Sequence, residues 1–216
     1  MVFLKTSTVS TYALLFFTPA EASLIDALVA RIIPDEDGSP GAKEAGVTEY
    51  IDHALAGNQH DLQPVYRDGL RALSAYSEAR FGSSFRFLDR HRQEAVVEEL
   101  DRLATADERA FLGRFFQIVR EHTVQGYFGD PAYGGNRDAV SWTLIGFPGA
   151  QQAYSSTQLE TGFDSARIPV LTVNDLYRSI HEKRQSPEGG EQPVPHSTPE
   201  RAGETPRDTE TQGEDS

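Results

Sequence analysis

The sequence contains no cysteine. For the chain itself, this absence excludes a disulfide framework, a thiolate zinc site, an iron–sulfur cluster, a covalently attached c-type haem and a cysteine nucleophile. Long apolar runs are missing too: the longest one near the start, residues 12–17, has six residues, whereas a membrane-spanning helix needs about 20. We therefore expect no direct membrane span.

Positive charge is also scarce. The chain carries 20 Lys and Arg against 33 Asp and Glu, which gives a net charge of −13, and it has no basic run. Proteins that bind nucleic acids without sequence preference neutralise phosphates with Lys and Arg. The composition therefore argues against a nucleic-acid partner.

The C-terminal residues 185–216 have almost no apolar side chains. Their only aliphatic residues are Val194 and Ala202, they contain no aromatic residue, and they include five prolines and eight acids. Such a composition buries too little apolar surface to offset chain entropy. We therefore expect three parts: an N-terminal lead segment (1–17), a helical domain (18–184) and a disordered acidic tail (185–216).

The residues that follow the lead segment admit two interpretations. The stretch 20–22 (Ala-Glu-Ala) resembles the small-x-small cleavage site of a secretory signal. However, Thr18, Pro19 and Glu21 also form the capping box that begins a helix. We favour the helix start, because the apolar run before it is short and the sequence has no Arg-Arg pair of a twin-arginine signal. The chain is therefore interpreted as cytoplasmic.

Apolar residues recur at helical spacing along most of the domain, and no stretch alternates convincingly with a period of two. We therefore expect an all-α fold, an irregular orthogonal helical bundle rather than a coiled coil. A weakly patterned, polar segment over 150–170 is expected to be extended. The expected helices cover about 19–33, 47–56, 61–80, 90–103, 106–127, 138–145 and 173–183. The last of them begins with a second Thr-x-x-acid box, Thr172 to Asp175. The apolar stripe of the helix over 106–127 is Phe111, Leu112, Phe115, Phe116, Ile118, Val119 and His122/Thr123.

The segment 127–149 differs in amino-acid composition from the helices around it. Seven of the chain's 21 aromatic residues fall between positions 115 and 147, interleaved with glycines. The turn formers Asp130-Pro131 and Gly134-Gly135-Asn136 lie within it. We expect a compact aromatic and glycine-rich loop, held together by its Tyr, Phe and the single Trp.

No self-sufficient active site is visible in the sequence. The six histidines form no HExxH motif or other close metal spacing, and there is neither a G-x-S-x-G elbow nor a Walker loop. Glu121 and His122 are neighbours on a helix and point about 100° apart. We interpret His122 as a core histidine. The alternative is a stand-alone helical enzyme or ligand-binding protein that uses Glu121, His122 and the 127–149 loop.

Several motifs together resemble those of a known family, the gluconate 2-dehydrogenase subunit 3 family. The loop carries the most specific of them, and three helical stretches are similar to the family as well. The resemblance covers about residues 17–149. The motifs are Tyr127-Phe128-x-Asp130-Pro131-x-Tyr133-Gly134-Gly135-Asn136-Arg137-Asp138-x3-Trp142-x2-Ile145-Gly146-Phe147-Pro148-Gly149, Phe17-Thr18-Pro19-Ala20-Glu21 leading to Ile33-Pro34, the stretch 41–51 (GAKEAGVTEYI), and Tyr66-Arg67-x-Gly69-Leu70.

This resemblance implies a non-catalytic small subunit. In such complexes a large flavin-dependent dehydrogenase of the glucose-methanol-choline type holds FAD and oxidises a sugar, a sugar acid or a glycoside. A multihaem cytochrome c subunit often accepts the electrons. The small subunit is thought to support folding, stability or export of the flavoprotein, and the complexes are often periplasmic or membrane-associated. The resemblance therefore implies FAD and haem c in partner subunits and no cofactor in this chain.

The loop is the candidate surface for binding the flavoprotein partner. Large rigid aromatic rings make good interface anchors, and glycines allow close backbone approach. The alternative is that these aromatic residues form part of the domain's own core. The candidate partner-binding residues are Tyr127, Phe128, Asp130, Tyr133, Asn136, Arg137, Asp138, Trp142, Phe147 and Pro148.

Overall fold

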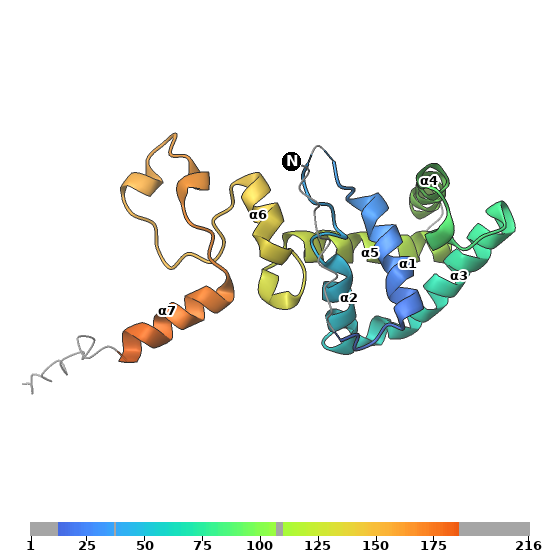
Figure 1. Ribbon diagram of the computed structural model, residues 1–216, viewed down its shortest axis with the longest axis horizontal. Coiled ribbons are helices and arrows are strands. Elements are labelled where there is room, and N and C mark those ends of the chain that lie inside the picture. The colour runs from blue at the N-terminus through green and yellow to red at the C-terminus, as the bar shows by residue number, and fades with distance from the viewer. Residues whose placement is uncertain (1–12, 37, 107–109, 186–216) are drawn as a thin grey trace, which may run out of the picture.

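The computed structural model describes residues 13–36, 38–106 and 110–185. Within these ranges the chain forms seven α-helices and six short 3-10 turns but no β-strand, so the predicted all-α irregular bundle is confirmed (Figure 1). The tail predicted to be disordered lies outside the described residues, except for Gln185. The helices are α1 (Pro19–Ile32), α2 (Val47–Ala56), α3 (Gln63–Phe81), α4 (Arg90–Ala106), α5 (Phe111–Phe128), α6 (Val140–Ile145) and α7 (Val173–Gln185).

Helix α5 is the centre of the bundle, and α1, α2, α3 and α4 all pack against it. Its stripe of buried residues was expected from the sequence, and it meets the apolar faces of the other helices in one core. Two of the largest fully buried side chains of this core, Tyr66 of α3 and Phe115 of α5, pack edge to face with their ring centroids 5.6 Å apart. Other fully buried members of the core are Ile25, Leu28, Ile51, Leu55, Leu73, Phe85, Val96 and Leu100.

Helix α1 begins as the capping box predicts. The Thr18 side chain accepts a hydrogen bond from the Glu21 amide (3.3 Å), and the Glu21 carboxylate accepts one from the Thr18 amide (2.9 Å). This reciprocal pair satisfies two backbone donors that a helix start leaves open. The small-x-small stretch therefore lies within the first turn of α1.

The described part of the lead segment is docked on the body of the protein. The buried Asp52 carboxylate on α2 accepts three hydrogen bonds, from the amides of Leu15 (2.6 Å), Phe16 (3.0 Å) and Phe17 (2.7 Å). The Arg67 guanidinium donates to the Phe16 carbonyl (2.9 Å) and lies 4.2 Å from the centroid of its ring. Phe17 is buried in the core. The segment is therefore held by both charge and apolar packing.

The boundary between α4 and α5 differs from the prediction. We expected α4 to end near residue 103 and α5 to begin near 106, but α4 continues to Ala106 and α5 begins at Phe111. The last turn of α4 lies against α5, where Gln117 donates a hydrogen bond to the Ala104 carbonyl (3.1 Å). This side chain satisfies a carbonyl that the helix end leaves without a partner. This contact between α5 and α4 fixes the last turn of α4.

Residues 150–185, which we call the arm, extend away from the bundle (Figure 1). The segment before α7 was expected to be extended; it is irregular and contains two 3-10 turns. Helix α7 begins with the predicted box, in which the Asp175 carboxylate accepts from the Thr172 amide (3.0 Å). None of the described helices is both long and apolar enough to cross a membrane. The 3-10 turns of the chain are His60–Leu62, Phe85–Phe87, Pro131–Tyr133, Arg137–Ala139, Thr157–Leu159 and Ser165–Arg167.

Candidate functional site

The aromatic and glycine-rich loop (127–149) is anchored from within by two of its aromatic side chains. Tyr127 is 4% exposed, and its hydroxyl donates to the Pro40 carbonyl (2.8 Å). Trp142 is 5% exposed, and its indole Nε1 donates to the Phe128 carbonyl (2.7 Å). Aromatic residues with a polar group are buried at little cost when that group finds a partner. For Tyr127 and Trp142 the structure thus favours the core interpretation.

Asn136 closes the loop at its centre. It is fully buried, its Nδ2 donates to the Gly129 carbonyl (2.9 Å), and its Oδ1 accepts from both the amide (3.0 Å) and the hydroxyl (2.9 Å) of Ser141. Its φ of +44° lies in the left-handed region, which Asn tolerates better than most residues. One side chain therefore joins three points of the loop.

The short helix expected over 138–145 begins later than predicted. Asp138 (φ +58°) and Ala139 (φ +53°) are in the left-handed region, so right-handed helical geometry starts only at Val140. Left-handed backbone is costly for a residue such as Ala and persists only where surrounding contacts fix it. The hydrogen bonds of Asn136 supply such contacts on either side of this turn.

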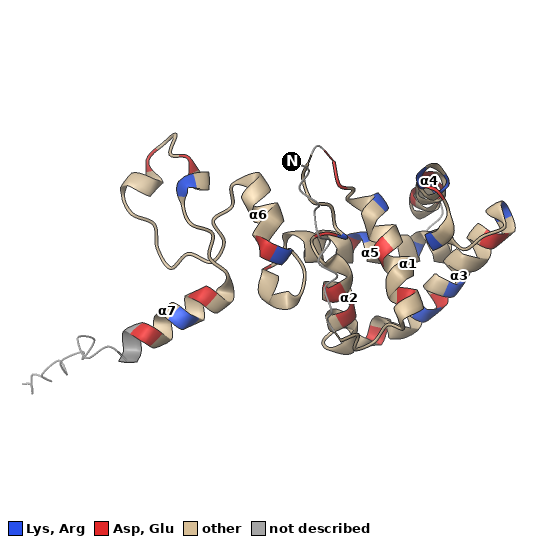
Figure 2. Ribbon diagram, viewed as in Figure 1, with Lys and Arg blue, Asp and Glu red and all other residues tan. Residues whose placement is uncertain are grey.

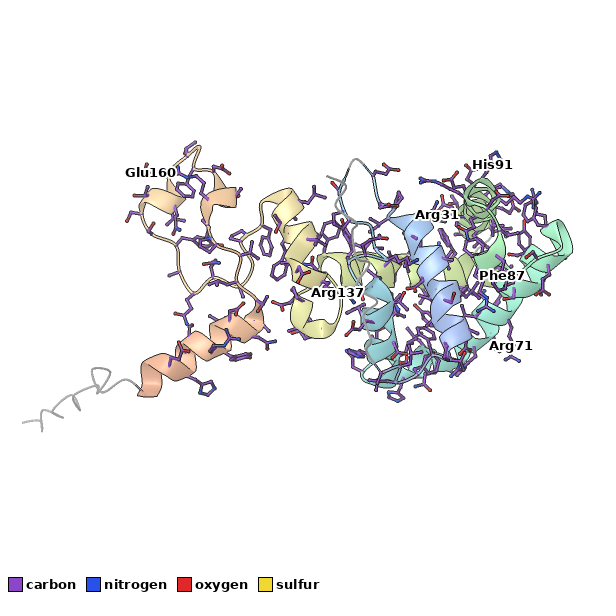
Figure 3. All side chains as sticks on the ribbon, viewed as in Figure 1. Arg31, Arg71, Phe87, His91, Arg137 and Glu160 are labelled. Carbon is purple, nitrogen blue, oxygen red and sulfur yellow. The ribbon has the colours of Figure 1, made fainter. Side chains whose placement is uncertain are left out.

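Arg137 connects the loop to α2. Its amide donates to the Ala45 carbonyl (2.9 Å), and its Nη2 lies 3.2 Å from Glu49 Oε2 in a partly buried ion pair. Figure 3 labels Arg137 between the loop and α2. Gly46 leaves room for the guanidinium, because a Cβ atom there would lie 2.7 Å from Arg137 Nη2. The Glu49 partner was not predicted, because nothing in the sequence relates two residues 88 positions apart.

Asp130 connects the loop to the arm. One carboxylate oxygen accepts from the Ala132 amide (2.9 Å) and caps a 3-10 turn, while the other accepts from the Val173 amide (2.8 Å) at the start of α7. Pro148, which is buried, contributes its carbonyl to the amide of Leu171 (3.0 Å). These contacts are internal to the chain, so both residues have a structural role.

The remaining candidates are exposed to solvent. Phe128 is 42% exposed, Tyr133 59% and Phe147 44%, and Asp138 is exposed as well. The structure thus divides the predicted site into an inward set (Tyr127, Asn136, Trp142, Pro148), a bridging pair (Asp130, Arg137) and an outward set (Phe128, Tyr133, Asp138, Phe147). Their role in binding a partner stays a prediction.

Two outward residues were missed by the sequence analysis. Leu144 and Ile145 of α6 are 57% and 58% exposed, next to the exposed Phe147. Helical spacing could not have found them, because Leu144 and Ile145 follow the buried Ser141 by three and four positions and would be expected on the same face of α6.

His122 and Glu121 lie on different faces of α5. His122 is 4% exposed in the core, where its Nδ1 shares a 2.7 Å hydrogen bond with the Tyr66 hydroxyl and its ring stacks on Tyr66 at 5.7 Å between centroids. Glu121 is exposed. Burial lowers the pKa of His122, although the Glu121 charge acts in the opposite direction. Among the described residues, no group of three His, Cys, Asp or Glu could hold a metal ion.

The buried histidine predicts a pH dependence of stability. Because the pKa of His122 is lowered in the folded state, the unfolded chain binds more protons just below pH of about 6.5. The free energy of unfolding should therefore fall as the pH is lowered through this window. Urea unfolding of the protein and of His122→Gln between about pH 5 and 7.5 should show a shallower slope for the variant. The matched control is His91→Gln, at an exposed position; a variant H122Q that keeps the full slope would contradict the prediction.

The family model described as gluconate 2-dehydrogenase subunit 3 matches residues 19–149, which is more than half of the chain. The chain belongs to the gluconate 2-dehydrogenase subunit 3 family. No curated protein and no solved structure matches it. The region matched by the subunit 3 model begins at the first residue of α1 and ends at Gly149, the last residue of the loop. The arm therefore lies beyond the region that the family model describes.

Proposed function

We propose that this chain is the non-catalytic small subunit of an FAD-dependent dehydrogenase complex of the glucose-methanol-choline type, which oxidises a sugar, a sugar acid or a glycoside. In this proposal the flavoprotein subunit holds FAD, a cytochrome c subunit can carry haem c, and the small subunit supports folding, stability or export of the flavoprotein. Membership of the subunit 3 family supports an accessory role in a dehydrogenase. The burial of His122, away from Glu121, supports a chain without its own acid–base pair.

One observation carries the proposed docking site: the loop is fixed from within while it presents aromatic rings to solvent. Asn136 and Trp142 hold the loop by four hydrogen bonds, and Phe128, Tyr133 and Phe147 point outward. A rigid aromatic side chain loses little entropy when a partner covers it, and a pre-organised loop loses little more. The outward set is therefore suited to bind a protein surface.

The test uses outward residues, because substitution of Trp142 would damage the loop itself. A double variant Phe128→Ser/Tyr133→Ser should bind the purified flavoprotein subunit about tenfold more weakly or worse, since interface aromatics commonly contribute more than 1 kcal/mol each. Its melting temperature should stay close to that of the natural chain, because both side chains are exposed. Calorimetric titration of the chain into the flavoprotein measures the binding affinity, and a thermal melt measures the melting temperature.

The matched control is Phe87→Ser, which removes another exposed ring, 69% exposed, from the 3-10 turn before α4. It should bind the flavoprotein as tightly as the natural chain. A natural chain that binds no flavoprotein, or that turns over a sugar, sugar acid or glycoside by itself, would overturn the proposed function.

A further inference from the structure

A long stretch of the chain around α6 contains no charged residue. Between Asp138 and Glu160, residues 139–159 include no Asp, Glu, Lys or Arg, although charged residues make up 25% of the sequence. In Figure 2 this stretch is uniformly tan, whereas the bundle and α7 show both red and blue. Depletion of charge together with enrichment of aromatic residues is typical of the central part of a protein–protein interface.

The arm has almost no core of its own. Among residues 150–182, Ile168 is the one buried side chain (6% exposed). Large apolar side chains on the arm are instead exposed: Tyr154 is 42%, Leu159 70% and Tyr177 59% exposed. Ordering a segment of this length costs conformational entropy that one buried side chain does not offset. The arm therefore has the character of a segment that gains its stability against another surface.

The base of the arm is nevertheless fixed relative to α6. The Ala150 amide donates to the Leu171 carbonyl (2.7 Å), which joins the start of the arm to the residues just before α7. From the second 3-10 turn of the arm, the Ser165 hydroxyl donates to the Gly146 carbonyl (2.7 Å) at the end of α6. The exposed Leu144, Ile145 and Phe147 therefore adjoin the base of the arm, and the uncharged surface continues from the loop into the arm.

We infer that α6 and the arm form a second docking surface, which clasps the flavoprotein subunit of the proposed complex. This inference rests on the proposed function and extends its site. Leu144, Ile145, Tyr154 and Leu159, within the uncharged stretch, are the main anchors, and the exposed Tyr177 of the charged helix α7 adds a further ring. The partner surface that fits them is apolar and uncharged, with hydrogen-bonding groups at its edge for the irregular backbone of the arm.

The choice of occupant follows from charge and position. A nucleic acid or an anionic bilayer is recognised through Lys and Arg, which residues 139–159 lack, so a protein surface is favoured. The arm also adjoins the outward face of the loop, and it lies outside the region that the family model matches. In this inference the loop docks through residues inside the region that the family model matches, and the arm adds a contact outside that region.

The test compares two sets of exposed apolar residues on the full chain. The arm variant Tyr154→Ser/Leu159→Ser/Tyr177→Ser should bind the purified flavoprotein subunit about tenfold more weakly or worse. The control Phe87→Ser/Phe111→Ser, at positions 69% and 37% exposed on the bundle and away from the loop, should bind normally. Hydrogen exchange on the natural chain gives an independent measurement: backbone amides of 151–167 should become protected when the flavoprotein is added.

The outcomes separate this inference from the proposed function. If the natural chain binds no flavoprotein, both are overturned. If the natural chain binds and the arm variant binds equally well, or if the arm amides stay unprotected in the complex, the arm inference alone is overturned. If the isolated natural chain is a dimer by light scattering and the arm variant is a monomer, the arm contacts a second copy and the inference is likewise overturned.

Discussion

Replacement of Asp52 by alanine is expected to lower the free energy of unfolding by about 3 kcal/mol and to release the lead segment from α2. The natural carboxylate accepts three hydrogen bonds from consecutive backbone amides, and each hydrogen bond to a charged group contributes about 1.5–3 kcal/mol. The expected loss is less than the sum of the three, because the released amides regain hydrogen bonds to water. These three hydrogen bonds form a clamp on the lead segment. Without the clamp the side chain of Phe17, which is 4% exposed in the natural protein, should become exposed to solvent.

Urea unfolding measures the stability of the Asp52 variant, and hydrogen exchange of the amides of residues 15–17 reports the release directly. Glu98→Ala is the matched control, since it removes one negative charge from an exposed position on α4. It should change stability by less than about 0.5 kcal/mol. An Asp52→Ala protein in which these amides remain as protected as in the natural chain would show that the clamp does not hold the segment.

Gly113→Ala is expected to cost about 2–3 kcal/mol, although alanine is the better helix former by about 1 kcal/mol. A Cβ atom at position 113 would lie 2.6 Å from the Ala104 nitrogen and 2.7 Å from the Leu103 carbonyl carbon. Both are backbone atoms, so no rotamer change relieves the clash and α4 has to move away from α5. The change also separates Gln117 from the carbonyl that it caps.

Gly126→Ala in the same helix is the comparison that isolates the cause. A Cβ atom there would approach the ring of Tyr50, at 2.7 Å from Cδ1. The ring belongs to a partly exposed side chain, so a change of rotamer relieves its two close atoms, and the Tyr50 Cβ, which stays in place, is 3.0 Å away. Thermal melts should therefore show a smaller loss for Gly126→Ala than for Gly113→Ala. Equal losses would mean that helix geometry, rather than backbone contact between α4 and α5, determines the cost.

The elements that the sequence predicts well are those whose signals are local. The capping boxes at Thr18–Glu21 and Thr172–Asp175 lie within four residues of chain, and both form as expected. The apolar stripe of α5 also predicts most of its buried face, although Phe111 at the start of the stripe is exposed. In contrast, the end of α4 depends on contact with α5 through Gln117 and Ala104, and no local pattern encodes such a contact.

The candidate site was predictable as a segment but not in its orientation. Composition identifies the loop, but it does not say which rings point inward. Trp142 is buried because its indole finds the Phe128 carbonyl, and Tyr127 because its hydroxyl finds Pro40, 87 residues away in sequence. The left-handed backbone around Asn136 depends on the same long-range closure. The exposed residues of α6 and the arm were missed because no sequence pattern shows which apolar side chains the fold leaves uncovered.

The clamp on the lead segment has a consequence for synthesis on the ribosome. The Phe16 carbonyl is bound by Arg67, which lies 51 positions later in the chain. At translation speeds of about 5–20 residues per second, several seconds pass between the synthesis of these two residues. Docking also waits for α5, the centre of the bundle, which is made later still. The order of synthesis therefore keeps the amides of residues 15–17 without their Asp52 partner for at least this interval.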